Sequence, residues 1–250
     1  MKVSNFKEKL NRTLEILFPK DFKCFLCSNE VDESENCLCN ACENSNIFCD
    51  KVCERCGTPV KSEAKYCLIC LNHKREFDFA RSPMKYEGNV ISAVHAFKFD
   101  GKTFLAEKFA KVMIKSFNEL KEKVGNFDYL IAVPLHKKRL KERGYNQALL
   151  IAKEISVLTN VPVLEDVVIK TKATPSQRNF SRKERIENVK DSFKVVDKDK
   201  ILKGKNILIV DDVLTTGATT EAISEKLKKA KANKICVLTF ARADVEKDIK

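Results

Sequence analysis

The segment that decides the fold is Ile207-Leu-Ile-Val-Asp-Asp-Val-Leu-Thr-Thr-Gly-Ala-Thr-Thr220. Its four leading apolar residues predict a buried strand of the kind that lies at the centre of a parallel sheet. We expect Asp211 and Asp212, which follow directly, to end this strand. A short loop rich in hydroxyl groups then opens a helix expected over residues 218–230. The segment therefore predicts a strand–loop–helix unit.

The loop of this unit has the composition of a phosphate-binding site. The hydroxyls of Thr215, Thr216 and Thr219 and the backbone amides around Gly217 lie at the start of the helix, where a phosphate group is readily bound. The two carboxylates precede the loop closely enough to bind the hydroxyls of a sugar whose phosphate the loop holds. The segment predicts a site for a ribose 5-phosphate group. A generic turn in which an aspartate caps the helix is the plainer alternative.

The same segment resembles the 5-phosphoribosyl-1-pyrophosphate (PRPP) signature of type I phosphoribosyltransferases, where apolar residues, two acids and a Thr-Thr-Gly loop stand in this order. The resemblance implies that Asp211 and Asp212 bind the ribose 2- and 3-hydroxyls and that PRPP is bound with Mg²⁺. It also implies that the 5-phosphate is bound by the loop residues Thr215, Thr216, Gly217, Ala218 and Thr219.

Strand and helix patterns alternate through the rest of the chain after residue 78. Strands are expected at 79–86, 128–133, 163–170, 193–196, 207–210 and 235–241, and helices at 90–97, 104–121 and 145–158. This order predicts an α/β fold with a doubly wound, mainly parallel sheet, as in type I phosphoribosyltransferases. Ligands of such sheets bind beyond the carboxyl ends of the strands.

A second expected strand end, near residue 133, carries polar and basic residues. In type I phosphoribosyltransferases the corresponding loop binds pyrophosphate, so the resemblance assigns this role to Val133, Pro134, Leu135 and His136. Arg143 follows, beside Gly144 and the neutral donors Asn146 and Gln147, and a guanidinium group suits phosphate oxygens. We expect Arg143 to balance the charge of the leaving pyrophosphate, whereas the lysines between residues 137 and 141 could equally form a solvated helix start.

The front of the chain is rich in cysteine. Ten of the eleven cysteines lie between residues 24 and 70, and eight of them form Cys-x-x-Cys pairs: Cys24/Cys27, Cys39/Cys42, Cys53/Cys56 and Cys67/Cys70. Such pairs let two thiolates reach one tetrahedral ion, so the pattern predicts two structural zinc sites of four cysteines each. Disulfides are the competing interpretation, and a reducing cytosol disfavours them.

The sequence leaves the pairing of these cysteines open. Sequential sites (Cys24, Cys27, Cys39, Cys42 and Cys53, Cys56, Cys67, Cys70) are the simplest arrangement, and a cross-braced arrangement is the alternative. Cys37 could replace Cys39, and His73 could serve as a ligand or lie on the surface. Cys236 lies in an apolar strand and is expected to be a core residue.

Length and charge set the wider organisation. The 250 residues are enough for one full domain and a small appended module, which we place at residues 79–250 and 1–78. The net charge of +12 comes from the larger domain, because residues 1–80 hold 12 Lys/Arg against 13 Asp/Glu. A basic domain suits a polyanionic ligand. No apolar run is long enough to span a membrane, and residues 1–20 predict an amphipathic helix, so we expect a cytoplasmic protein.

Residues 171–191 are polar and basic, and we interpret them as a hood that closes over the reacting centre or as a charged linker. Together with the motifs above, the fragments Thr174-Pro-Ser-Gln177 and Glu184-Arg-Ile-Glu-Asn-Val189 make the chain similar to the ComF family. The resemblance implies a zinc module joined to a phosphoribosyltransferase-like domain and a role in the uptake of DNA during bacterial transformation.

Two functions follow from this resemblance. In the first, the protein is a competence protein that binds PRPP and receives single-stranded DNA, with DNA-uptake or helicase proteins as partners. In the second, it is an active phosphoribosyltransferase that acts on an unknown acceptor in nucleotide metabolism, with Asp211, Asp212 and Arg143 as the catalytic residues.

Overall fold

The structure is a computed structural model of the chain. It describes residues 23–31, 37–46, 51–61, 63–172, 189, 191–197 and 199–243. The expected amphipathic helix at residues 1–20 and most of the expected hood lie outside these residues. Among the helices that are described, none is both long and apolar enough to cross a membrane.

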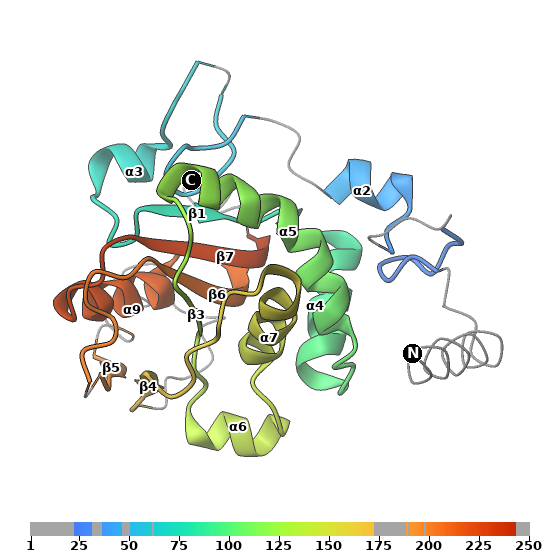
Figure 1. The fold of residues 1–250 in the computed structure, drawn as a ribbon. Coiled ribbons are helices and arrows are strands. Elements are labelled where there is room, and N and C mark those ends of the chain that lie inside the picture. Colours follow the sequence, from blue (N-terminus) through green and yellow to red (C-terminus); the bar gives the residue numbers. More distant parts are fainter. Residues whose placement is uncertain are drawn as a thin grey trace, which may run out of the picture.

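A parallel sheet forms the centre of the molecule (Figure 1). Its strands are β1 (Phe79–Arg81), β2 (Met84–Lys85), β3 (Tyr129–Ala132), β6 (Ile207–Leu214) and β7 (Ile235–Arg242). They are ordered β1-β7-β6-β3, and the short strand β2 pairs with the carboxyl-terminal end of β7. All of these pairings are parallel, so the expectation of a mainly parallel α/β sheet is confirmed.

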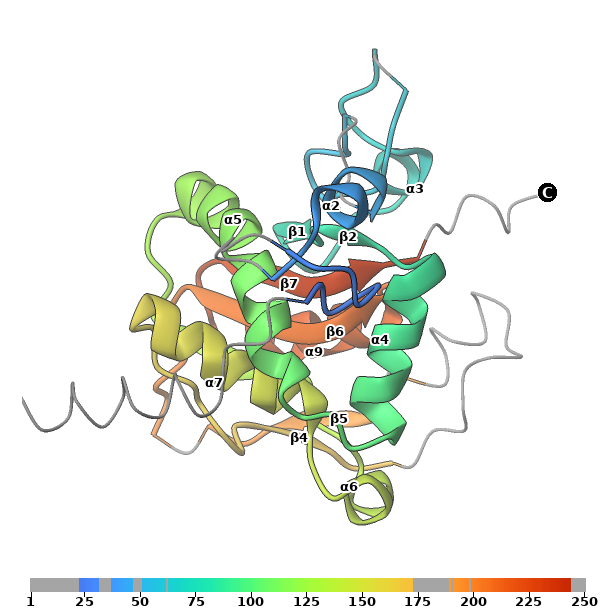
Figure 2. The same cartoon turned by 90° about the vertical axis from the view of Figure 1, so that its right-hand side faces the viewer.

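Helices cover both faces of this sheet, as the side view in Figure 2 shows. One face carries α4 (Gly88–Phe99), α5 (Leu105–Val124) and α7 (Gln147–Thr159), and the other carries α9 (Ala218–Lys229). Successive side chains of a strand point to opposite faces, so Leu208 and Val210 enter the core beneath α5 whereas Ile207 and Ile209 enter the core beneath α9. These four residues are fully buried, which explains the unbroken apolar run of β6.

Two of the expected strands do not join the central sheet. β4 (Val168–Lys170) and β5 (Phe193–Val195) pair with each other in antiparallel orientation. The strand expected over residues 163–170 is therefore too long, because only Val163 at its start bridges to Leu130 of β3. A long insertion separates β4 from β5, and their pairing across it could not be derived from local pattern.

The cysteine-rich segment consists of tight turns and two short helices, α2 (Asn40–Asn46) and α3 (Leu68–Asn72). Each of its halves begins with an isolated antiparallel bridge around a Cys-x-x-Cys turn, Lys23 with Glu30 and Val52 with Pro59. Gly57 lies in the second of these turns with φ +72°, and a Cβ there would come within 2.8 Å of the carbonyl oxygen of Ala80. The second half therefore packs directly against β1.

Candidate functional site

The acid pair lies inside strand β6, which corrects our expectation that it ends the strand. β6 continues to Leu214 because β7 pairs with it beyond the acids, with Asp211 opposite Thr239 and Val213 opposite Ala241. Each carboxylate accepts a hydrogen bond from the next backbone amide, Asp212 N to Asp211 Oδ1 at 2.9 Å and Val213 N to Asp212 Oδ1 at 2.8 Å. The two side chains are thereby held in fixed positions.

The charges of this pair are partly balanced by a lysine that sequence reasoning missed. Lys98 Nζ, near the end of α4, lies 2.5 Å from Asp212 Oδ2, and Asp212 is only 3% exposed. Burial, and then the negative charge of Asp212, raise the pKa of Asp211 well above its usual value. A cluster of this kind favours ligands that supply hydroxyl donors or cations to the carboxylates.

The phosphate loop, defined here as Thr215, Thr216, Gly217, Ala218 and Thr219, begins one residue after β6 and ends in the first turn of α9. Gly217 adopts φ +83° at the N-cap of the helix, a conformation that favours glycine. The hydroxyl of Thr216 accepts a hydrogen bond from Ala218 N at 3.4 Å, and Thr220 donates to the carbonyl of Gly217 at 2.9 Å. The loop is thus preshaped at the N-terminus of a twelve-residue helix.

The turn of Val133, Pro134, Leu135 and His136 follows β3 and lies at the same edge of the sheet. Val133 N donates to the carbonyl of Val210, the residue before the acid pair, at 2.9 Å. Asn146 donates from its side chain to the carbonyl of Val133 at 3.1 Å while capping α7. His136 caps α6 (Lys137–Arg143) by accepting a hydrogen bond from Lys138 N through Nδ1. The structure therefore brings this turn and the acid pair together.

Two further cations, Arg143 and Lys170, lie close enough to interact with the acids. Arg143 donates to Gln147 Oε1 at 2.5 Å and stacks over Phe99 at 5.1 Å. Burial lowers the pKa of Arg143, and Asp212 opposes this effect. Lys170 of β4 lies over Phe193, and burial together with the charge of Arg139 lowers its pKa, whereas Asp211 opposes the shift. With Lys98, these groups form a basic rim around the acid pair.

A cleft of about 340 Å³ opens between α4 and α6 beside this rim, lined by Lys98, Phe99, Gly101, Arg139, Glu142, Arg143 and Tyr145. The hydroxyl of Tyr145 donates to the carbonyl of Phe97, which joins the segment after α6 to α4 next to Lys98. Lys98 and Lys170 carried no signal in the sequence, because each is one lysine among many. Only their position identifies them.

The eight paired cysteines gather into two tetrads in the sequential arrangement. The first tetrad is Cys24, Cys27, Cys39 and Cys42, and the second tetrad is Cys53, Cys56, Cys67 and Cys70, with the sulfurs of each within 4.8 Å of one another. A zinc ion with four sulfurs at 2.3 Å would place them about 3.8 Å apart. Cys27 and Cys39, and likewise Cys56 and Cys67, have sulfurs 3.6 Å apart, so both tetrads fit zinc.

Cys37, Cys236 and His73 lie outside the two tetrads. Cys37 accepts a hydrogen bond from Lys108 Nζ at 3.1 Å and does not replace Cys39. His73 is exposed. Cys236 is fully buried in β7, as expected for a core residue. Cys49 lies outside the described residues.

Comparison with known proteins agrees with this arrangement. The profile described as "Phosphoribosyl transferase domain" matches residues 142–250, and the profile described as "Double zinc ribbon domain" matches residues 13–71. Competence protein F of Haemophilus influenzae is 29% identical over 89% of this chain and 98% of its own length. The chain therefore resembles competence proteins of the ComF type over most of its length. The tetrads are accordingly structural zinc sites of a double zinc ribbon, and the part of the chain that contains β6, α9 and β7 matches a phosphoribosyltransferase domain.

Other relatives carry related names. Competence protein ComFC of Bacillus subtilis is 24% identical over 93% of this chain and 89% of its own, and the DNA utilization protein YhgH of Escherichia coli is 24% identical over 88% and 96%. Among solved structures, adenine phosphoribosyltransferase of Saccharomyces cerevisiae aligns with 56% of this chain and 71% of its own at 19% identity and a TM-score of 0.36. That score is too low to carry an argument.

Proposed function

We propose that this protein is a competence protein whose phosphoribosyltransferase domain binds PRPP at the edge of the sheet around Asp211. One observation carries the proposal: the acid pair in the carboxyl-terminal half of β6, the phosphate loop that follows β6 and the turn of residues 133–136 that follows β3 lie on the same side of the sheet. In an open α/β sheet this is where ligands bind. The ligand needs both hydroxyl groups and phosphates, because the edge offers both carboxylates and cations.

Each group of the site has a role in this proposal. Asp211 and Asp212 bind the ribose hydroxyls, and the phosphate loop binds the 5-phosphate. The turn of residues 133–136 and Arg143 bind the pyrophosphate, with Lys98 and Lys170 adding positive charge. Mg²⁺ accompanies PRPP and neutralises part of the charge of its pyrophosphate.

The names of similar proteins support the proposed role in the cell. Relatives named competence protein F, competence protein ComFC and DNA utilization protein suggest that this protein acts in the cytoplasm on incoming single-stranded DNA, together with DNA-uptake or helicase proteins. Lys137, Lys138 and Lys141 of α6 are exposed and could follow a phosphate backbone. We expect single-stranded DNA to bind with an affinity that falls steeply between 50 and 200 mM salt, and a flat salt profile would count against direct binding.

Turnover is the second candidate function. The basic rim favours it, because a departing pyrophosphate develops charge that Arg143, Lys98 and Lys170 can stabilise. The acceptor would be a separate molecule whose recognition the described residues do not identify. His136 is poorly suited to act as a base, because its Nδ1 already caps α6.

Calorimetric titration of the zinc-loaded protein with PRPP and Mg²⁺ tests the proposal. We expect binding in the wild type and a loss of at least about 100-fold in Asp211→Asn/Asp212→Asn, because two charged hydrogen-bond acceptors are removed. Asp199→Asn is the matched control, since Asp199 is an exposed aspartate in the turn between β5 and β6. If the wild type does not bind PRPP, the proposal fails.

A further inference from the structure

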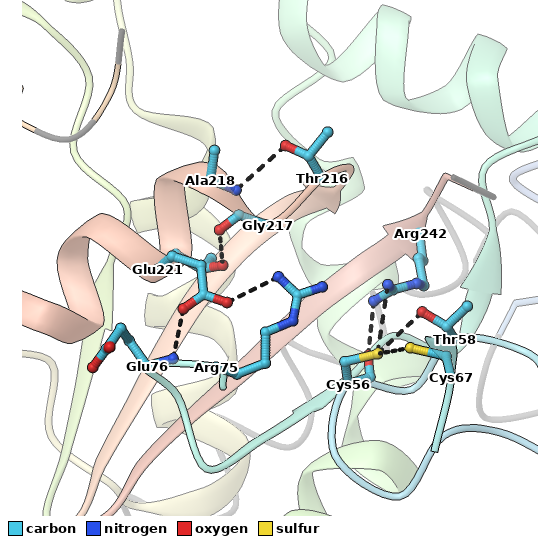
Figure 3. A network of polar contacts seen from close by, with 11 residues as sticks. Cys56, Thr58, Cys67, Arg75, Glu76, Thr216, Gly217, Ala218, Glu221 and Arg242 are labelled. Atoms are coloured by element: carbon cyan, nitrogen blue, oxygen red, sulfur yellow. Dashed lines mark hydrogen bonds and ion pairs between the residues drawn. The ribbon is translucent and has the colours of Figure 1, made fainter. Parts of the chain in front are cut away.

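The segment that follows the second tetrad clamps the first turn of α9. Arg75 is five residues beyond Cys70, and its Nη1 donates to Glu221 Oε1 at 2.9 Å. The backbone amide of Glu76 donates to the other oxygen, Glu221 Oε2, at 2.6 Å. Arg75 is 8% exposed, and the Glu221 side chain is 21% exposed. Both oxygens of this glutamate are therefore held by the chain leaving the second tetrad, as Figure 3 shows.

The same guanidinium group lies against the phosphate loop. A Cβ built on Gly217 would come within 3.4 Å of Arg75 Nη1, so the arginine packs directly behind the glycine at the N-cap of α9. Arg75 thus joins the chain that leaves the second tetrad to the helix that begins with the loop.

A second contact reaches the other end of the phosphate loop. Arg242, the last residue of β7, is 3% exposed and donates through Nη1 to the carbonyl of Cys56 at 2.7 Å. Arg242 is the register partner of Leu214, and Ala243 N donates to the carbonyl of Leu214 at 3.0 Å. Leu214 immediately precedes Thr215, the first residue of the loop. Contacts from the second tetrad therefore reach both ends of the loop.

The charge of a zinc-loaded tetrad would strengthen this arrangement. Four thiolates around a divalent ion carry net negative charge, and Arg75 and Arg242 each bury an Nε donor that has no hydrogen-bond partner among the described residues. Loss of the ion would leave four thiolates that take up protons, which removes the net negative charge, and would loosen the tight turns around Cys56 and Cys70. The two arginines would then lose their fixed positions behind the loop.

We propose that the second tetrad and the phosphate loop form one coupled unit, in which Arg75 is a positioning residue and zinc occupancy sets the affinity of the loop for a phosphate group. The proposal rests on the PRPP site proposed above. The first tetrad serves as the internal reference. The residues next to its cysteines contact other parts of the domain: Phe25 packs against Phe109 and Phe240, and Cys37 accepts a hydrogen bond from Lys108.

Zinc release from the full-length wild-type protein tests this coupling without any mutation. An excess of a chromogenic chelator is added with and without saturating PRPP and Mg²⁺. Coupling between two binding sites is reciprocal. We therefore expect bound PRPP to raise the affinity of one of the two sites for zinc at least about fivefold against the chelator, and to leave the affinity of the other site unchanged. Equal loss from both sites with PRPP bound would overturn the proposal.

Hydrogen exchange provides a readout that needs no PRPP. We expect removal of zinc from the second tetrad to speed amide exchange in residues 215–221, and removal from the first tetrad alone to leave it unchanged. If the wild type does not bind PRPP, the PRPP proposal fails while this measurement still decides the coupling. Unchanged exchange in residues 215–221 after loss of both ions would refute the coupling.

Substitutions then identify the connecting residues. In Glu221→Gln and Arg75→Met we expect two zinc ions per chain, native circular dichroism and a dissociation constant for PRPP raised about five- to tenfold. Arg75→Lys should recover only part of this loss, because an ammonium group cannot pack and pair as the guanidinium does. Glu225→Gln is the matched control, one turn further along α9 in the exposed pair with Lys229. If Glu221→Gln and Glu225→Gln bind PRPP equally well, Arg75 has no positioning role.

Discussion

The two cysteine tetrads share one chemistry but have different surroundings. All four cysteines of the second tetrad are buried, whereas Cys27 and Cys39 of the first tetrad are half-buried. The first tetrad joins the core beneath α4, α5 and α7, mainly through Phe25, whose ring lies 5.8 Å from that of Phe109. The second tetrad joins the core beneath α9 and is linked to the start of the phosphate loop through Arg242, while Arg75, which follows it in the chain, pairs with Glu221 in the first turn of α9. Identical metal sites can therefore serve the same domain in different ways.

The largest difference is expected when each tetrad loses one ligand. Cys53→Ser should release one zinc ion, expose the segment around residues 51–70 and lower PRPP affinity, because zinc supplies on the order of 10 kcal/mol of the folding free energy of such a module. Cys27→Ser should also release one zinc ion but leave PRPP affinity within about twofold. Zinc content, limited proteolysis and calorimetric titration measure these effects. Equal losses of PRPP affinity in both variants would remove the distinction between the tetrads.

A smaller effect is expected from the apolar contact of the first tetrad. Phe25→Ala removes a ring that packs against Phe109 and Phe240, and we expect the free energy of unfolding to fall by about 2 kcal/mol. PRPP affinity should stay unchanged, because this contact does not reach the phosphate loop. Urea denaturation measures the change, and Leu71→Ala, at an exposed position beside the second tetrad, is the control. A fall in PRPP affinity for Phe25→Ala would show that the first tetrad also supports the site.

The smallest expected effect is a pH-dependent change in the free energy of unfolding that comes from the acid pair. It should not depend on the first tetrad. Burial and the charge of Asp212 raise the pKa of Asp211, so the folded state holds a proton that the unfolded state loses above its own pKa of about 4. The free energy of unfolding therefore falls as the pH rises from this value through the higher pKa of the folded state.

Asp211→Asn removes the free-energy cost of ionising this carboxyl group in the folded state. The free energy of unfolding of the variant should therefore exceed that of the wild type by roughly 1 kcal/mol at pH 7.5, with a smaller difference at pH 5.5. Paired urea titrations at both pH values measure it, since protons exchanged by the cysteines cancel in the difference between the two proteins. The same gain is expected in a Cys27→Ser background. A variant less stable than the wild type at pH 7.5 would contradict a raised pKa at Asp211.

Local patterns in the sequence predicted the elements that depend on neighbouring residues. Three features are recognised within a few residues: the apolar run at Ile207–Val210, the Thr-Thr-Gly loop and the Cys-x-x-Cys pairs. Buried strands, helix N-termini and metal-binding turns each have a short sequence signature. The end of β6 was predicted wrongly, since its continuation to Leu214 depends on pairing with Thr239, Ala241 and Arg242 of β7.

The contacts that complete the site join residues far apart in the chain. Lys98 pairs with Asp212, and Arg75 with Glu221, which is 146 residues away. No periodicity singles out Lys98 or Arg75, because their roles depend on which side chains the folded sheet and helices bring within a few ångströms.

The sequence by itself thus predicted the acid pair, the Thr-Thr-Gly loop and the eight paired cysteines, because each is recognised from adjacent residues, but it left open which cysteine pairs share an ion. Only the tertiary structure decided that the two tetrads differ. Parallel pairing of β6 with β7 sets Arg242 beside the start of the loop, and packing of α9 on the sheet sets Glu221 beside Arg75. These placements arise from burial of the two apolar faces of the sheet, a property of the whole domain that no single segment contains.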